Sequence, residues 1–369
     1  MNVIGEERNE KQHSVRTDLA VEAKDMYVEQ EQQTEEIPGV AVMDETHKDV
    51  KVSKIIISDE GEMTLQKKPG TYITIYADGV KKQDTKKQEN AATVLAKEVQ
   101  GLLQASNITT ESKGLIVGLG NWNVTPDALG PMTVEKVMVT NHLFELEYET
   151  VQSGYRPVAA ISPGVMGVTG METSDIVLSV IQQFDPAFVL VVDALASRSI
   201  ERINETIQLT DSGIHPGSGV GNHRKELSKE TLGIPVIAIG VPTVVDAVTI
   251  ASDTLDYVLM HMGREWQEKD RPKKSLLSSN MPIGHNNLNE ADLPNPSERE
   301  TFLGLVGNLT DVEKRTLLEE VLTPMGRNLM VTPKEIDGFM NDMAYVIARA
   351  MNAALHENIS VDNNADYTR

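Results

Sequence analysis

Two aspartates follow short apolar segments that have the composition of buried strands. Asp127 comes shortly after Gly114–Leu119, and Asp193 lies near the end of Ala187–Ala194, the most apolar of these segments. A carboxylate at the end of an apolar strand is costly to bury unless it is paired or functional. Two carboxylates that share a site separate their pKa values, so one can take a proton from water while the other donates one. Because this chemistry can hydrolyse an amide, Asp127 and Asp193 are the candidate catalytic residues.

Other interpretations of these aspartates stay open at this point. Asp127 could cap the helix that follows it, and Asp193 could form a salt bridge with Arg198. A metal site is a further alternative, in which both aspartates join one of three histidines: His142, His215 or His223. The chain has no cysteine, no Gly-x-Ser-x-Gly elbow and no His-Glu-x-x-His motif. Cysteine, serine-triad and zincin chemistry therefore have no support.

A glycine-rich segment over residues 210–222 carries further candidate residues. Its glycine spacing could cradle an anion, but it lacks the Gly-Lys-Ser/Thr ending of a nucleotide-binding P-loop. A mobile loop that contacts substrate fits better. Ser212 and His215 are the candidate substrate-binding residues in this loop.

Composition limits the classes of partner. The 369 residues are 40% hydrophobic and carry a net charge of −21. The only basic cluster, Lys81 to Lys87, is typical of a solvated turn, so no nucleic-acid partner is expected. The N-terminus has no apolar signal segment, and no apolar run is long enough to span a membrane. The sequence predicts a soluble intracellular protein that does not contact membranes.

The elements that must position these residues are expected to form an α/β fold. Apolar strands alternate with helical patterns, which predicts a mostly parallel sheet covered by helices on both faces. The expected strands are 114–119, 157–161, 187–194 and 234–239, and the expected helices are 91–104, 133–148, 174–183 and 243–262. Two β-rich runs predict a small antiparallel element within residues 52–76. Residues 267–297 are expected to be a mobile excursion, and residues 298–369 a helical part with helices over 311–322 and 334–356.

Four longer motifs carry a family resemblance. They are Ser14–Ala23, Gly118–Pro131, Phe188–Arg198 and Asp211–Arg224. In these motifs the chain resembles the germination proteases of endospore-forming bacteria, a family of atypical aspartic-type endopeptidases. The resemblance implies a homotetramer in the cytoplasm of the forespore and spore core that degrades small acid-soluble spore proteins without a cofactor. It also implies a phosphorylase/hydrolase-like core similar to that of the hydrogenase-maturation peptidases, some of whose carboxylates bind metal. A metal-dependent peptidase of the same fold, or a non-enzymatic binding module for basic spore proteins, remain the alternatives.

The resemblance also assigns roles to individual positions. The family's catalytic aspartates fall on Asp127 and Asp193. Its zymogen pro-segment falls on residues 1–18, which leaves residues 19–369 as the peptidase domain. Self-cleavage is then expected between Asp18 and Leu19, where the sequence has an acidic residue, an apolar residue and an alanine in succession. A preference for an acidic residue before the cut requires a cationic subsite, for which Arg198 and Arg224 are the candidates.

Overall fold

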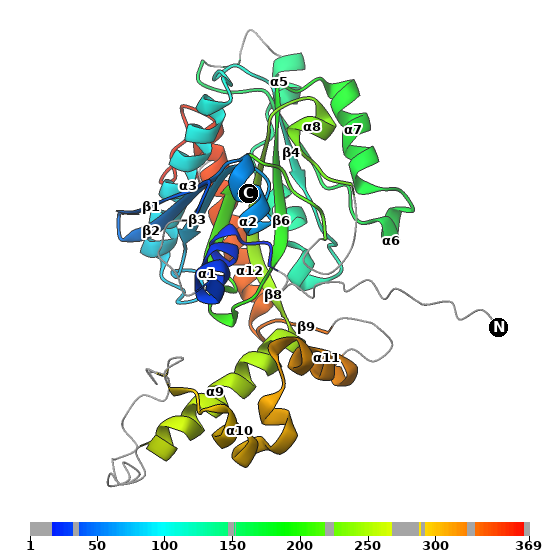
Figure 1. The fold of residues 1–369 in the computed structure, drawn as a ribbon. Coiled ribbons are helices and arrows are strands. Elements are labelled where there is room, and N and C mark those ends of the chain that lie inside the picture. The colour runs from blue at the N-terminus through cyan, green and yellow to red at the C-terminus, as the bar shows by residue number, and fades with distance from the viewer. Residues whose placement is uncertain are drawn as a thin grey trace, which may run out of the picture. The chain divides into compact units, whose positions relative to one another are not determined.

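The chain divides into two compact units in a computed structural model. The structure describes residues 17–31, 37–146, 151, 153–217, 225–267, 288, 292–322 and 329–364. The larger unit spans residues 16–245 and 331–369 and contains the sheet, whereas the smaller unit includes residues 246–330 (Figure 1). Within the described residues, no helix is both long enough and apolar enough to cross a membrane.

A mixed sheet forms the centre of the larger unit. Its strands are β1 (Val40–His47), β2 (Val50–Ile57), β3 (Gly70–Tyr76), β4 (Gly114–Gly118), β5 (Val158–Ile161), β6 (Phe188–Ser197), β7 (Thr206–Thr210), β8 (Val236–Asp246) and β9 (Met330–Val331). The strand order is β1-β2-β3-β7-β8-β6-β4-β5, and β9 pairs with β8. Strands β8, β6, β4 and β5 run parallel, and β7 joins them in antiparallel orientation to the β1-β2-β3 meander. The expected α/β class is confirmed, and so is the antiparallel pairing of the two β-rich runs.

Helices cover both faces of the sheet because the central strands are apolar on both sides. On one face lie α3 (Thr85–Ala105), α4 (Leu129–Val134) and α12 (Ile336–Leu355). On the other lie α7 (Thr173–Phe184), α8 (Lys229–Leu232), α1 (Ala20–Glu31) and α2 (Asp59–Leu65) (Figure 1). Strand β6 shows this alternation directly. Leu190 and Val192 pack in the core cluster formed with α3 and α12, and Val189 and Val191 pack in the cluster formed with α7 and α8.

Two expected helices differ from the structure. The expected helix over 133–148 is interrupted, leaving α4 and α5 (Asn141–Leu146). Between them Thr140 binds the segment that leads into β5: its N–H donates to the carbonyl of Val158 over 2.9 Å, and its hydroxyl donates to the carbonyl of Arg156. The expected helix over 243–262 begins later, as α9 (Ala247–Gln267). Its first residues instead extend β8, where Val244 and Val245 pair with β6 and β-branched side chains favour a strand.

The smaller unit is helical in its described part. It contains α9, α10 (Pro296–Leu303), the 3-10 helix η7 (Gly304–Asn308) and α11 (Asp311–Leu322). Lys314 of α11 donates to Asp256 of α9 over 2.6 Å, and the rings of Trp266 and Phe302 meet edge to face at 5.6 Å. The bounds of α11 match the expected ones. Most of the expected excursion over 267–297 lies outside the described residues.

Candidate active site

Asp193 lies on β6 just beyond the point where its neighbour β4 ends. Gly118, the last residue of β4, is in register with Val192, and the N–H of Leu119 donates to the carbonyl of Val192 over 2.8 Å. Asp193 follows immediately and is only 5% exposed. Its Oδ1 accepts from the N–H of Ala194 over 2.9 Å. A buried carboxylate therefore stands at the carboxyl end of the parallel strands, the edge at which such sheets bind ligands.

Asp127 is brought to the same strand ends by a tight turn after β4. Gly120 has a φ of +112°, and a Cβ atom there would lie 1.9 Å from the carbonyl oxygen of Asp127, so only glycine fits. Asp127 ends the short 3-10 helix η1 (Thr125–Asp127), and its carbonyl accepts from the N–H of Asn121 over 2.9 Å. The hydroxyl of Thr243 on β8 donates to the carbonyl of Pro126 over 2.7 Å. Helix η1 thus lies against β6 and is fixed to β8.

The capping interpretation of Asp127 is not supported by the helix that follows. Helix α4 begins at Leu129, and its N-cap residue is Ala128 rather than Asp127. The Asp127 side chain is half-buried.

The predicted processing site lies along the same strand. Ala196 of β6 donates its N–H to Oδ2 of Asp18 over 2.9 Å, and its carbonyl accepts from the N–H of Asp18 over 3.1 Å. Alternate residues of a strand turn their backbone groups to the same side. Since Val192 bonds to Leu119 on the β4 side, Ala196 faces that side too. Asp18 therefore hydrogen-bonds to the same edge of β6 that β4 occupies up to Val192.

The residues after Asp18 are buried in an apolar cluster. Leu19 and Ala20 are both 0% exposed and pack in one cluster with Leu65, Tyr72 and Leu195. Leu195 lies two residues beyond Asp193 and so points to the same face of the sheet. The predicted cut between Asp18 and Leu19 therefore lies within the folded unit, on the face towards which Asp193 points.

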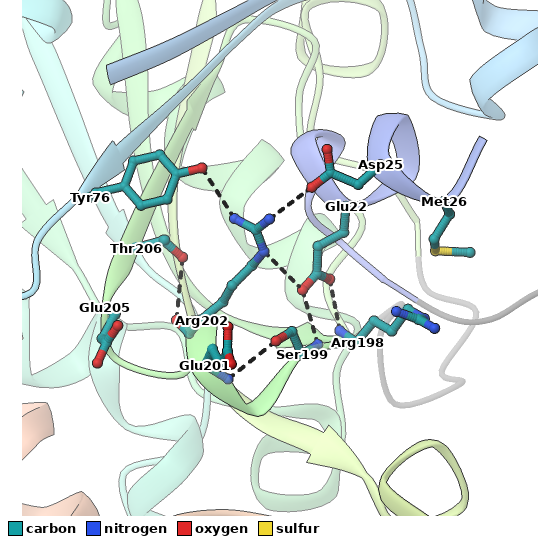
Figure 2. Close-up of a pocket in the computed structure, with 10 residues that line it drawn as sticks. All are labelled: Glu22, Asp25, Met26, Tyr76, Arg198, Ser199, Glu201, Arg202, Glu205 and Thr206. Atoms are coloured by element: carbon teal, nitrogen blue, oxygen red, sulfur yellow. Dashed lines mark hydrogen bonds and ion pairs between the residues drawn. The ribbon is translucent and has the colours of Figure 1, made fainter. Parts of the chain in front are cut away.

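Glu22 on α1 ties this segment to the end of β6. It is 3% exposed and accepts the N–H groups of Arg198 and Ser199 over 2.7 and 3.0 Å. The Arg202 guanidinium lies 3.4 Å from Glu22, 2.8 Å from Asp25 and 3.3 Å from the Tyr76 hydroxyl. Figure 2 shows Arg202 between these three partners, with the Arg198 side chain directed away from them. The group lines a cavity of about 340 Å³.

The remaining predicted site residues are distributed over other parts of the unit. Arg198 lines the cavity beside Glu22, and Arg224 lies outside the described residues. Ser212 donates to the Tyr72 hydroxyl over 2.8 Å, and burial raises the pKa of Tyr72 to about 12. His215 lies 3.7 Å from Glu226, with which it forms an ion pair only when protonated. The structure therefore places Asp193 on β6, packs η1 with Asp127 against β6 and holds Asp18 on Ala196 of the same strand, whereas Ser212 and His215 follow β7.

Sequence reasoning missed two residues that hold the N-terminal segment. Lys67 donates to the carbonyl of Thr17 over 2.8 Å. Gln208 accepts from the N–H of Ala20 over 2.7 Å and donates to the carbonyl of Asp18 over 3.1 Å. The run Thr206–Thr210 alternates polar and apolar residues, which favours an exposed Gln208, so its burial is seen only in the structure. Lys67 stands in a polar turn and carries no signal either.

The histidine and carboxylate side chains also bear on the metal alternative. Among the residues that the structure describes, no group of three or more of them is arranged to hold a metal ion. The histidine proposed for such a site at position 223 lies outside the described residues.

Comparisons with known proteins all indicate the same family. A family model described as "Germination protease" matches residues 20–368. A germination protease of Oceanobacillus iheyensis is 66% identical over 358 residues, which are 96% of this chain and 98% of that protein. Germination proteases of Bacillus cereus and Priestia megaterium are each 55% identical, and the matches cover 96% and 97% of this chain and 97% and 98% of those proteins. The chain therefore belongs to the germination protease family, and its activity is that of a protease.

Proposed function

We propose that the chain is an endopeptidase zymogen whose catalytic groups are the carboxylates of Asp127 and Asp193. The observation that carries this proposal is the position of Asp193, buried directly beyond the end of β4 with η1 against the same strand. Two nearby carboxylates favour a shared proton, because ionising both in one buried site is costly. One carboxylate is then ready as a base and the other as an acid.

The reaction follows from this protonation state. The ionised carboxylate takes a proton from a water molecule as the water oxygen attacks the carbonyl carbon of the peptide. The protonated carboxyl gives its proton to the peptide nitrogen, and the C–N bond breaks. The products are a carboxylic acid and an amine, and the two side chains have exchanged one proton.

Self-cleavage between Asp18 and Leu19 is the second part of the proposal. It is supported by the hydrogen bonds that hold Asp18 against Ala196, on the strand that carries Asp193. Because Leu19 is fully buried, this bond becomes accessible only when the segment leaves β6. Residues 1–18 then act as a pro-segment and residues 19–369 as the processed protease.

The substrates and setting are proposed from the family. The relatives are named germination proteases. The family resemblance of the four motifs implies small acid-soluble spore proteins as the substrates. We infer that this chain cuts such proteins after an acidic residue, as a homotetramer in the spore core. The net charge of −21 supports a basic or neutral protein substrate rather than a nucleic acid.

The test replaces each aspartate by asparagine, which keeps size and removes the ionisable group. We expect Asp127→Asn and Asp193→Asn each to lose roughly 10²-fold or more of cleavage of a purified spore protein and to form no new N-terminus at Leu19. Asp175→Asn serves as the matched control, since Asp175 is exposed on α7 and pairs with Lys225. Thermal unfolding of each variant checks that the fold is retained.

Three results would refute the carboxylate mechanism. Full activity in either variant excludes an essential aspartate pair. Loss of wild-type activity in a strong chelator, with recovery on adding a divalent metal, instead supports the metal-dependent peptidase. A chain that neither forms a new N-terminus at Leu19 nor cuts spore proteins at mildly acidic pH supports a non-enzymatic binding role.

A further inference from the structure

Thr17 and Asp18 lie in a site built from three separate segments of the chain. Lys67 Nζ donates to the carbonyl of Thr17 over 2.8 Å, and Gln208 Nε2 donates to the carbonyl of Asp18 over 3.1 Å. The N–H of Ala196 donates to the Asp18 carboxylate over 2.9 Å, while the Ala196 carbonyl accepts from the Asp18 N–H over 3.1 Å. Both backbone and side chain of the acidic residue are thus recognised.

The site would remain after a cut between Asp18 and Leu19. All three recognising residues follow the cut in the sequence, and so does every residue of the three core clusters. In the uncut chain Leu19 and Ala20 are fully buried in their cluster, and Gln208 accepts from the N–H of Ala20. We expect Ala20 to keep this bond after the cut. Cleavage breaks one covalent bond and leaves the hydrogen-bonding groups of the site in place.

Departure of residues 1–18 changes the charge balance in the site. Burial lowers the pKa of Lys67, and the carboxylates of Asp18 and Glu22 oppose this shift. Once Asp18 leaves, one of these two carboxylates is lost. The half-buried Lys67 ammonium then has only the Glu22 carboxylate to stabilise its charge, so binding of another anion beside it is favoured. A peptide that ends in an acidic residue brings two carboxylates, one on its side chain and one at its C-terminus.

On the basis of the proposed cleavage after Asp18, we propose that Lys67, Gln208 and the backbone of Ala196 form a binding site for peptides that end in an acidic residue. The released N-terminal segment is one such peptide. Fragments made by cutting a substrate after an acidic residue have the same ending. Bound there, such a peptide covers β6 three residues beyond Asp193, so the site makes the processed protease sensitive to its own products.

A binding experiment tests this directly. The chain that begins at Leu19 retains all residues of the three core clusters, and circular dichroism checks its fold. The probe is a fluorescent peptide with the sequence of residues 13–18 and a free C-terminus, measured by anisotropy. We expect it to bind at least about tenfold more tightly than the same peptide ending in asparagine, as for a hydrogen bond to a charged group. Lys67→Met should remove this difference. Lys68→Met, whose lysine instead pairs with Glu226, should retain it. Equal affinity of the two peptides for the unsubstituted chain overturns the proposal.

A second measurement uses the full-length chain and needs none of its own activity. An added endoproteinase that cuts after acidic residues reports how often the bond after Asp18 is exposed. We expect Lys67→Met and Gln208→Leu to increase the rate of this cut at least about tenfold, and Lys68→Met to leave it unchanged. An unchanged rate in Lys67→Met overturns the site. If the added endoproteinase cuts the variants at the expected rates but the wild-type chain does not cleave itself, the proposed function is contradicted and the binding site is not.

Discussion

A buried histidine at the end of α12 should make the fold sensitive to acid. His356 is 1% exposed, and its Nδ1 accepts from the N–H of Arg156 over 3.1 Å. Within the described part of the chain, its Nε2 has no hydrogen-bond partner. Burial and, to a smaller extent, the positive charge of Arg156 lower the pKa of His356 from 6.5 to about 4, and the backbone of Met138 opposes part of this shift.

The sign of the effect follows from proton binding. Between pH 6.5 and 4 the unfolded chain has a protonated His356, whereas the folded chain keeps it neutral. The unfolded state therefore binds more protons, and the free energy of unfolding falls as the pH falls. With these two pKa values, the loss relative to pH 7 is about 2 kcal/mol at pH 5 and about 3 kcal/mol at pH 4.

Urea unfolding at several pH values measures this loss. His356→Asn is the informative variant, because its amide oxygen can accept from Arg156 and it does not titrate. We expect the wild-type chain to lose about 2 kcal/mol more than this variant between pH 7 and pH 5. His47→Asn is the control, since His47 lies on β1 beside Glu45 and its side chain is 35% exposed. A difference between wild type and His356→Asn that does not change with pH would falsify the reasoning.

Three further predictions concern the strand ends around the candidate site. Glu22→Gln should lower the free energy of unfolding by about 3 kcal/mol in urea, because Arg202 loses a buried partner; no destabilisation would contradict this role. Gly120→Ala should destabilise the fold by more than about 1 kcal/mol and abolish proteolysis, because the new Cβ would meet the Asp127 carbonyl. Gly101→Ala on α3, where a Cβ meets nothing within 4 Å, should be neutral or stabilising. Thr243→Val should lower the free energy of unfolding by about 1 kcal/mol, because it removes the hydrogen bond to Pro126 that holds η1. It should also reduce kcat in a peptide-cleavage assay, and an unchanged kcat would argue against a role of this hydrogen bond in the site.

The sequence was informative about the sheet because its central strands are apolar on both faces. Residues 114–119, 187–194 and 234–239 were expected as strands and correspond to β4, β6 and β8. Asp193 lies within β6, one residue beyond its last pairing with β4, and Asp127 lies in η1, which packs against β6. The strand order thus brings these two sequence regions to the same strand, and their catalytic role stays a prediction.

The contacts of the N-terminal segment could not be predicted from local sequence. Asp18 is held by Ala196 and Gln208, which are 178 and 190 residues away in the sequence. Helix α1 and strand β1 were also not predicted from the sequence. Strand β1 is an edge strand whose side chains are largely exposed, so charged residues are tolerated and no apolar alternation marks it. Long-range partners and exposed edges leave little local signal.

The length of β6 places the proposed catalytic residue Asp193 and the partner of Asp18 on one strand. Its register with β4 ends at Val192 and the strand continues to Ser197, so five residues extend beyond the last paired position. Backbone groups on that overhang need hydrogen-bond partners wherever they are buried. Asp18 supplies them at Ala196, and an extended substrate chain could do the same by strand addition. If the catalytic proposal holds, the N-terminal segment then inhibits by occupying the strand edge beside Asp193, without any distortion of the carboxylates. The substrate and the N-terminal segment then compete for the same backbone groups of β6, so a substrate can bind there only after the segment has left.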